Sequence, residues 1–133
     1  MIRKRCQLLQ KLTFESKWDK TIADQDRERI KQLFQKTILD PGINIQFTSL
    51  WQAKNHRGEL LVAVLIHNTS QRNFTFLDQI MTYVVSGTIF AEHTFPSPIT
   101  VEKQTSMPWT FIFPVGSFNS SQSFEDGVLR ITS

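Results

Sequence analysis

Residues 59–68 (ELLVAVLIHN) constrain the fold of this chain more than any other segment. Every position from Leu60 to Ile66 is apolar, so both faces of an extended strand here would be apolar. A strand of this kind needs packing on both of its faces. Residues 106–114 (SMPWTFIFP) form a second run of the same character. These two segments therefore predict buried core strands rather than an active site.

The remaining sequence predicts one helix followed by short strands. The helix is expected at about residues 24–37, with Asp24 as its N-cap. Its apolar residues, Ile30, Leu33 and Phe34, recur at helical spacing. After the helix the apolar period changes to two. About seven strands, with turn signals every ten or so residues, predict a mainly β chain: an antiparallel, immunoglobulin-like β-sandwich with this N-terminal α-helix.

The length of 133 residues predicts a single domain over residues 1–133, with residues 1–13 as a flexible, basic lead-in. The single cysteine, Cys6, excludes an intrachain disulfide. No run of about 18 apolar residues is present, so we expect no transmembrane segment. The apolar run after the basic start is too short and too polar for a secretion signal, so we expect a cytoplasmic protein.

Basic residues gather at the N-terminal end of the chain. Residues 1–36 hold ten Lys/Arg and five Asp/Glu, whereas the rest of the chain holds five and seven. One alternative function is therefore binding to nucleic acid or to another anionic surface through Arg3, Lys4, Arg5 and Lys11. Aromatic residues do not alternate with these cations as a nucleic-acid groove requires. The sequence thus favours a solvated basic face and a partner other than nucleic acid.

Residues suited to catalysis are few. The chain contains no phosphate-binding loop, dinucleotide glycine pattern, Cys-x-x-Cys or Gly-x-Ser-x-Gly. Glu92 and His93 are neighbours on a predicted strand, so their side chains point to opposite faces. A zinc site at His67 and His93 would lack a third ligand. We therefore expect no enzyme, no cofactor and no metal, with a small metal-dependent enzyme around His67 and His93 as the other alternative.

Several segments together resemble the SLAP domain, a module of S-layer assembly proteins of the accessory secretion system in Gram-positive bacteria. The run from Ser106 to Pro114 is the most specific part, through its Ser-x-Pro-Trp-x-Phe-x-Phe pattern. The further matching positions are Trp18, Ile22–Arg27, Phe34, Ile45, Thr48, Ala53–Asn68, Ala91–His93 and Phe95. The resemblance implies a non-enzymatic protein that helps to assemble or export surface-layer proteins. Its implied partner is an S-layer protein or an accessory secretion component.

A protein-interaction module needs exposed contact residues. The candidate partner-binding residues lie on the predicted helix and on the loop before residue 59: Arg27, Lys31, Lys36, Asn55, His56 and Arg57. Loops at residues 69–73 and 119–123 are further candidates, and strand edges offer a route to a homo-oligomer. Trp109, Phe111 and Phe113 share one face of a strand and are predicted to be core anchors.

Overall fold

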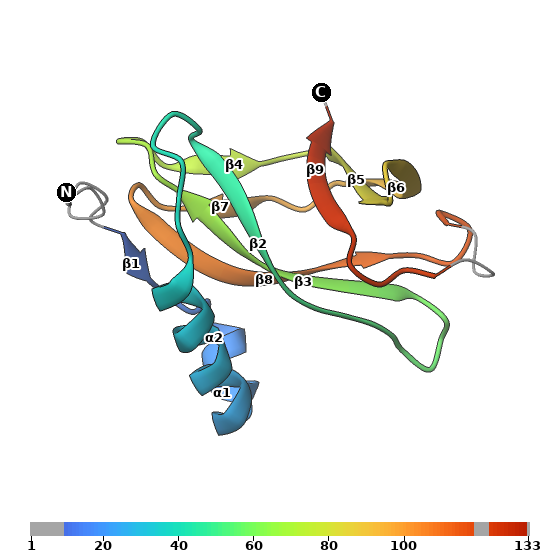
Figure 1. Ribbon diagram of the computed structural model, residues 1–133, viewed down its shortest axis with the longest axis horizontal. Helices are drawn as coiled ribbons and strands as arrows, with labels where there is room; N and C mark the ends of the chain where they lie inside the picture. The colour runs from blue at the N-terminus through green and yellow to red at the C-terminus, as the bar shows by residue number, and fades with distance from the viewer. Residues whose placement is uncertain (1–9, 119–122, 133) are drawn as a thin grey trace. The chain divides into compact units, whose positions relative to one another are not determined.

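The computed structural model describes residues 10–118 and 123–132, which form nine strands and two helices (Figure 1). In chain order these are β1 (Lys11–Leu12), α1 (Ser16–Thr21), α2 (Asp24–Lys36), β2 (Ile45–Lys54), β3 (Leu60–Asn68), β4 (Phe74–Phe76), β5 (Gln79–Val85), β6 (Thr88–Phe95), β7 (Ile99–Val101), β8 (Thr105–Phe113) and β9 (Val128–Thr132). Strands predominate, so the prediction of a mainly β chain is confirmed. The predicted helix is α2, and α1 is an addition to it.

The two helices begin with different capping arrangements. The side chain of Glu15 accepts hydrogen bonds from the backbone N–H groups of Lys17 (2.8 Å) and Trp18 (3.4 Å), which caps α1. The prediction that Asp24 caps α2 is wrong, because Ala23 is the N-cap residue and makes no side-chain hydrogen bond. Asp24 is instead the first helical residue, where its negative charge interacts favourably with the positive end of the helix dipole.

The strands form three hydrogen-bonded groups. The largest has the order β1-β8-β3-β2, β4 pairs with β7, and the third has the order β6-β5-β9. β1 runs parallel to β8, with Lys11 opposite Thr105 and Leu12 opposite Ser106. β5 pairs antiparallel with both β6 and β9. β1 thus gives structure to the end of the predicted lead-in, of which residues 1–9 lie outside the described residues.

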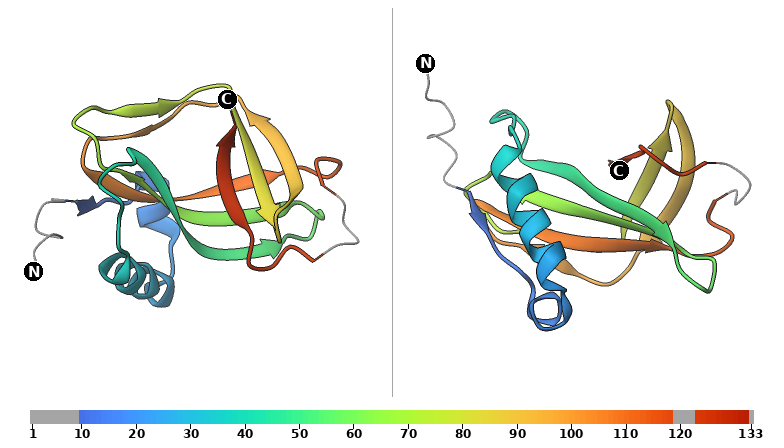
Figure 2. Two further views of the ribbon diagram at one scale, coloured as in Figure 1. Left: turned by 45° about the horizontal axis from the view of Figure 1, so that its top comes forward. Right: turned by 60° about the horizontal axis from the view of Figure 1, so that its bottom comes forward.

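The described chain divides into two compact units. Unit 1 comprises residues 10–50, 64–74 and 100–109, and unit 2 comprises residues 51–63, 75–99, 110–118 and 123–132. Unit 1 contains both helices, and Ile30 of α2 is fully buried in it. Figure 2 shows α1 beside the start of α2.

Aromatic side chains fill the core of unit 2. Phe95 of β6 contacts Phe111 and Phe113 of β8, with ring centroids 5.2 and 5.3 Å apart. Phe76 of β4 also contacts Phe111, at 6.3 Å. These contacts join β6 and β4 to β8, in keeping with the sandwich-like packing that the sequence predicted.

Tyr83 secures the loop that precedes β9. Its hydroxyl donates to the backbone carbonyl of Phe124 and accepts from the N–H of Gly127 at 3.0 Å. Burial raises the pKa of Tyr83 above its ordinary value. Gly127 lies so close to the ring that a Cβ atom there would be 2.2 Å from Cζ of Tyr83. The loop therefore needs glycine at this position.

Candidate functional site

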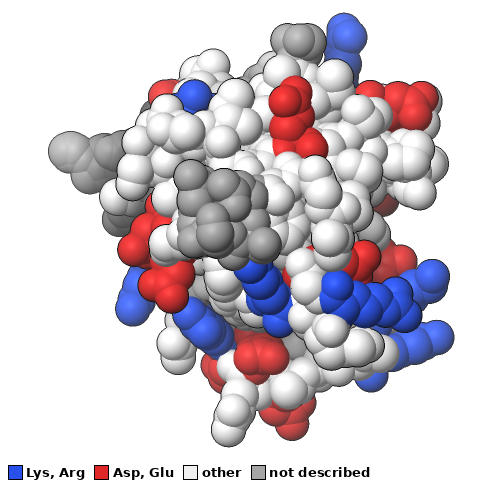
Figure 3. Space-filling view, turned by 90° about the vertical axis from the view of Figure 1, so that its right-hand side faces the viewer, with Lys and Arg blue, Asp and Glu red and all other residues white. Residues whose placement is uncertain are grey.

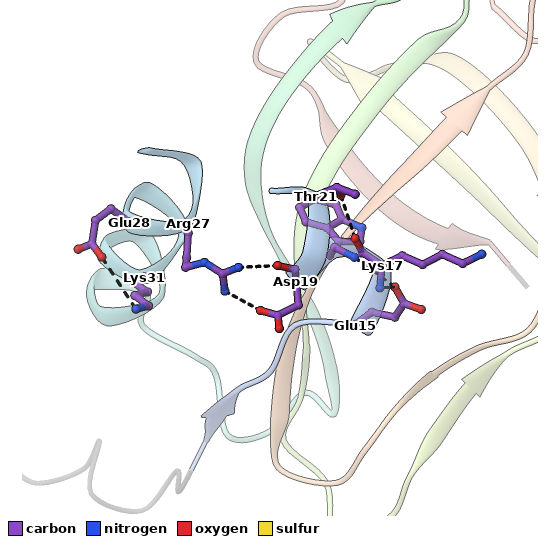
Figure 4. A network of polar contacts seen from close by, with 8 residues as sticks. Glu15, Lys17, Asp19, Thr21, Arg27, Glu28 and Lys31 are labelled. Atoms are coloured by element: carbon purple, nitrogen blue, oxygen red, sulfur yellow. Dashed lines mark hydrogen bonds and ion pairs between the residues drawn. The ribbon is translucent and has the colours of Figure 1, made fainter. Parts of the chain in front are cut away.

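Arg27, the first predicted partner-binding residue, is held by contacts within the chain. Its guanidinium donates to Oδ1 and to the backbone carbonyl of Asp19, both at 2.8 Å (Figure 4). The same group lies 4.8 Å from the centre of the Phe14 ring. Arg27 therefore fastens α1 to α2, and docking of a partner on Arg27 would compete with these contacts.

The other two predicted cations of α2 lie on a surface of mixed charge. Nζ of Lys31 lies 3.9 Å from Oε2 of Glu28, in an exposed pair (Figure 4). Lys36 is exposed in the last turn, where it favours the negative end of the helix dipole. Because acidic side chains accompany the cations along α2, the helix presents no field of a single sign to an acidic partner.

The predicted loop at residues 55–58 is a turn that its own side chains build. Oδ1 of Asn55 accepts from the backbone N–H groups of Arg57 (3.0 Å) and Glu59 (2.9 Å), and its Nδ2 donates to Oε1 of Glu59 at 2.8 Å. Gly58 has a φ of 82°, a left-handed conformation that favours glycine. Asn55 is thus committed to the turn, whereas His56 and Arg57 are exposed at its tip.

The charged side chains of the described residues are mixed in sign on one face of the protein. On the face shown in Figure 3, blue and red side chains are intermixed and no large patch of one sign forms. Of the basic lead-in residues, Lys11 lies in β1, while Arg3, Lys4 and Arg5 lie outside the described residues.

Neither α1 nor α2, the helices of the described segments, has the length and apolar character that a bilayer span needs.

Edge strands occur in both larger strand groups. β2 ends the order β1-β8-β3-β2, and β9 ends the order β6-β5-β9. An unpaired strand edge can pair with another chain. Assembly of this protein through strand edges stays a prediction.

His67 is fully buried within a chain of polar side chains in unit 1. Its Nε2 lies 2.8 Å from Oγ1 of Thr48, and its Nδ1 lies 2.6 Å from Oγ of Ser106. Oγ of Ser106 also accepts from Nε2 of Gln10 at 3.1 Å. Burial lowers the pKa of His67 to about 4, so its ring is neutral at pH 7. These contacts join β3 to β2 and β8 through hydrogen bonds.

The distance between Ser106 and His67 is that of a nucleophile and its base, but a substrate could not reach either side chain. Both residues are 0% exposed. The group on the far side of the ring is the hydroxyl of Thr48 instead of the carboxylate that orients a catalytic histidine. The arrangement therefore satisfies buried polar atoms, which the sequence pattern gave no means of detecting.

His93 has a different setting. It lies on β6 in unit 2, and its ring contacts the ring of Phe95 with centroids 4.9 Å apart. Within residues 10–118 and 123–132, no group of three or more His, Cys, Asp or Glu residues is arranged to hold a metal ion.

The three predicted core anchors differ in burial. Phe111 and Phe113 are fully buried, with exposed fractions of 1% and 0%. Trp109 is only half-buried. The three residues alternate along β8 and were predicted to share one face, but they are not equally buried.

An open pocket of about 450 Å³ lies in unit 1, at the start of β2 and along the segment that leads into β4. Its lining residues come from the start of β2 and from the segment that leads into β4: Asn44, Ile45, Ser70, Gln71, Arg72, Asn73 and Phe74. Residues 69–73 were predicted as a candidate loop, and the structure adds Asn44 and Ile45 to it. We call this site the Arg72 pocket.

The buried side chain of Asn68 fixes one wall of the Arg72 pocket. Its Nδ2 donates to the backbone carbonyls of Arg72 (2.8 Å) and Val101 (3.0 Å). Its Oδ1 accepts from the backbone N–H (3.0 Å) and the hydroxyl (2.7 Å) of Ser70. Asn68 is 0% exposed, and its bond to Val101 is buried, while its bonds to Ser70 and Arg72 are part-buried.

Two further contacts hold the segment to its neighbours. The backbone N–H of Thr69 donates to the carbonyl of Asn44 at 2.9 Å, which brings the β2 side of the pocket to the loop. Oδ1 of Asn73 accepts from the backbone N–H of Lys103 at 3.0 Å. The pocket is therefore formed by a loop that is held in place before any partner arrives.

Comparison with known proteins identifies the family. A family model described as the SLAP domain matches residues 12–127. No curated protein and no solved structure matches the chain. The match covers most of the sequence and agrees with the resemblance seen in the Ser106–Pro114 run, which forms most of β8. This chain belongs to the SLAP domain family.

Proposed function

We propose that this chain is a non-enzymatic protein-interaction module that acts in the cytoplasm, in S-layer assembly or accessory secretion. Membership of the SLAP domain family over residues 12–127 is the observation that carries the proposal. The partner is an S-layer protein or a component of the accessory secretion machinery. The Arg72 pocket supplies a preformed, exposed contact surface for such a partner.

The settings of the histidines support a role without catalysis. His67 and Ser106 have the geometry of a reactive pair, but neither is exposed to solvent. A general base must come within hydrogen-bond reach of the proton that it removes from a substrate. His93 contacts Phe95, and neither His67 nor His93 lines the Arg72 pocket.

Affinity capture in the native host tests the proposal. The full chain is immobilised and incubated with a lysate of that host, and the bound proteins are quantified by mass spectrometry. An unrelated β domain of similar size and net charge serves as the control. We expect enrichment of an S-layer protein or of an accessory secretion component over this control. If neither of these two classes of protein is enriched, the proposal is overturned.

Deletion of the gene gives an independent test in the cell. We expect less S-layer protein at the cell surface and more of it retained in the cytoplasm. Expression of the intact chain from a plasmid should restore the normal distribution. A deletion strain with normal secretion and a normal surface layer overturns the role in S-layer assembly.

A further inference from the structure

The Arg72 pocket contains one cation and no acidic side chain among its lining residues. Arg72 is exposed, and within the described residues its guanidinium makes no hydrogen bond or ion pair. The side-chain amides of Asn44 and Gln71 line the same pocket, also without hydrogen-bond partners in the described segments. The site therefore offers one positive charge and several N–H donors to an incoming group.

The rest of the lining is fixed or apolar. Ser70 and Asn73 already use their side-chain oxygens to hold the loop. Ile45 and Phe74 are half-buried and give the pocket apolar walls. Since Arg72 has its backbone carbonyl tied to Asn68, the base of its side chain is positioned while the guanidinium stays available. A ligand is thus expected to pair one anionic group with apolar neighbours.

We infer that the Arg72 pocket binds the carboxylate of an Asp or Glu side chain in a segment of the partner protein; this inference rests on the proposed function. A guanidinium matches a carboxylate through two parallel N–H···O bonds. The lining holds a single cation, which balances a carboxylate better than the double charge of a phosphate. The pocket volume of about 450 Å³ accommodates such a side chain together with an apolar neighbour.

An NMR titration of the full, isotope-labelled chain tests the inference. The probe is a blocked pentapeptide with Asp at its centre and Leu and Phe on either side, compared with the same peptide carrying Asn. We expect the Asp peptide to shift the amide signals of residues 44–45 and 70–74. The Asn peptide and the Arg72→Gln variant should each bind about tenfold more weakly, as the loss of a charged hydrogen bond implies.

Arg57→Gln is the matched control, because Arg57 is an exposed arginine in a different loop and does not line the pocket. This variant should bind the Asp peptide as the unaltered chain does. Equal binding by Arg72→Gln, or signal shifts confined to other residues, overturns the inference. Inorganic phosphate is titrated in parallel, and stronger binding of phosphate than of the Asp peptide at residues 70–74 also overturns it.

Capture with the Arg72→Gln chain separates this inference from the proposed function. If the unaltered chain enriches a secretion component and Arg72→Gln enriches it equally, the pocket inference fails while the proposed function stands. If Arg72→Gln loses that component and Arg57→Gln keeps it, both are supported. Failure of the unaltered chain to enrich either partner class overturns the proposed function alone, and the peptide titration then decides the inference.

Discussion

At the residue scale, burial determines how His67 responds to acid. Its pKa is about 4 in the folded protein, against 6.5 for an ordinary histidine. The folded protein therefore binds fewer protons than the unfolded chain between these values, so stability is lost as the pH falls through this window. The expected loss is at most roughly 1.4 kcal/mol for each pH unit. Urea denaturation at several pH values between about 7 and 4 measures it.

Two histidine variants isolate this effect from the titration of carboxylates. His67→Gln should flatten the dependence of unfolding free energy on pH, although it also lowers the stability at pH 7. His56→Gln should leave the dependence unchanged, because His56 is exposed in the loop at residues 55–58. The same pH dependence in His67→Gln as in the unaltered chain contradicts the assignment.

Gly127 is required by the close approach of Tyr83. A methyl group at Gly127 would lie 2.2 Å from Cζ and 2.6 Å from the hydroxyl oxygen of Tyr83. We expect Gly127→Ala to lower the free energy of unfolding by about 1–3 kcal/mol, the usual cost of overpacking. Gly42→Ala is the control, because the added carbon would lie 3.3 Å from Oδ1 of Asp40 and needs only a small adjustment. Similar urea midpoints for the two variants would argue against this steric account.

The aromatic residues of β8 should differ in their cost of removal. Phe111 contacts both Phe76 and Phe95 and is 1% exposed, so Phe111→Ala should cost about 3–5 kcal/mol. Trp109→Ala should cost less, because Trp109 is half-buried. Chemical denaturation of both variants gives the comparison. A larger loss for Trp109→Ala would show that exposure is a poor guide to the energetics of this strand.

At the scale of elements, the attachment of α1 depends on a small number of polar contacts. Asp19 accepts both hydrogen bonds from Arg27, and no residue of α1 is buried. Asp19→Ala should therefore speed hydrogen exchange in residues 16–21 while β3 stays protected. The global stability should change by no more than about 1 kcal/mol, as is usual for an exposed pair. Glu28→Ala, which removes the longer contact to Lys31, should leave exchange in α1 unchanged.

The start of β8 shows that local sequence pattern cannot predict where a strand begins when a distant segment pairs with it. The sequence predicts a buried strand within residues 106–114, although Pro108 ordinarily interrupts a ladder. The observed strand begins at Thr105, since its first two residues pair with β1. Pro108 lies past that short pairing, where β8 has no described partner on the β1 side. A two-residue strand such as β1 carries no periodicity, so it could not be predicted.

At the scale of the whole molecule, the net charge is only +3, so we expect no tight binding to nucleic acid. Arg27 is paired with Asp19, and acidic side chains accompany the cations of α2. We expect the full chain to leave the mobility of a short DNA duplex unchanged at physiological salt. Tight binding that weakens steeply as salt is raised would instead support the basic lead-in as a nucleic-acid arm.

The sequence by itself determined the mainly β class, the helix α2, the core strands β3 and β8, and the family. Each of these follows from local periodicity or from a contiguous run such as Ser106–Pro114, because the period of side chains along a segment depends only on its neighbours in the chain. Only the tertiary structure decided that Arg27 pairs with Asp19, that His67 is enclosed by Thr48 and Ser106, and that Asn44 meets the loop of Arg72. Such contacts join segments far apart in sequence, and their free energy comes from packing and hydrogen bonding that no single segment contains.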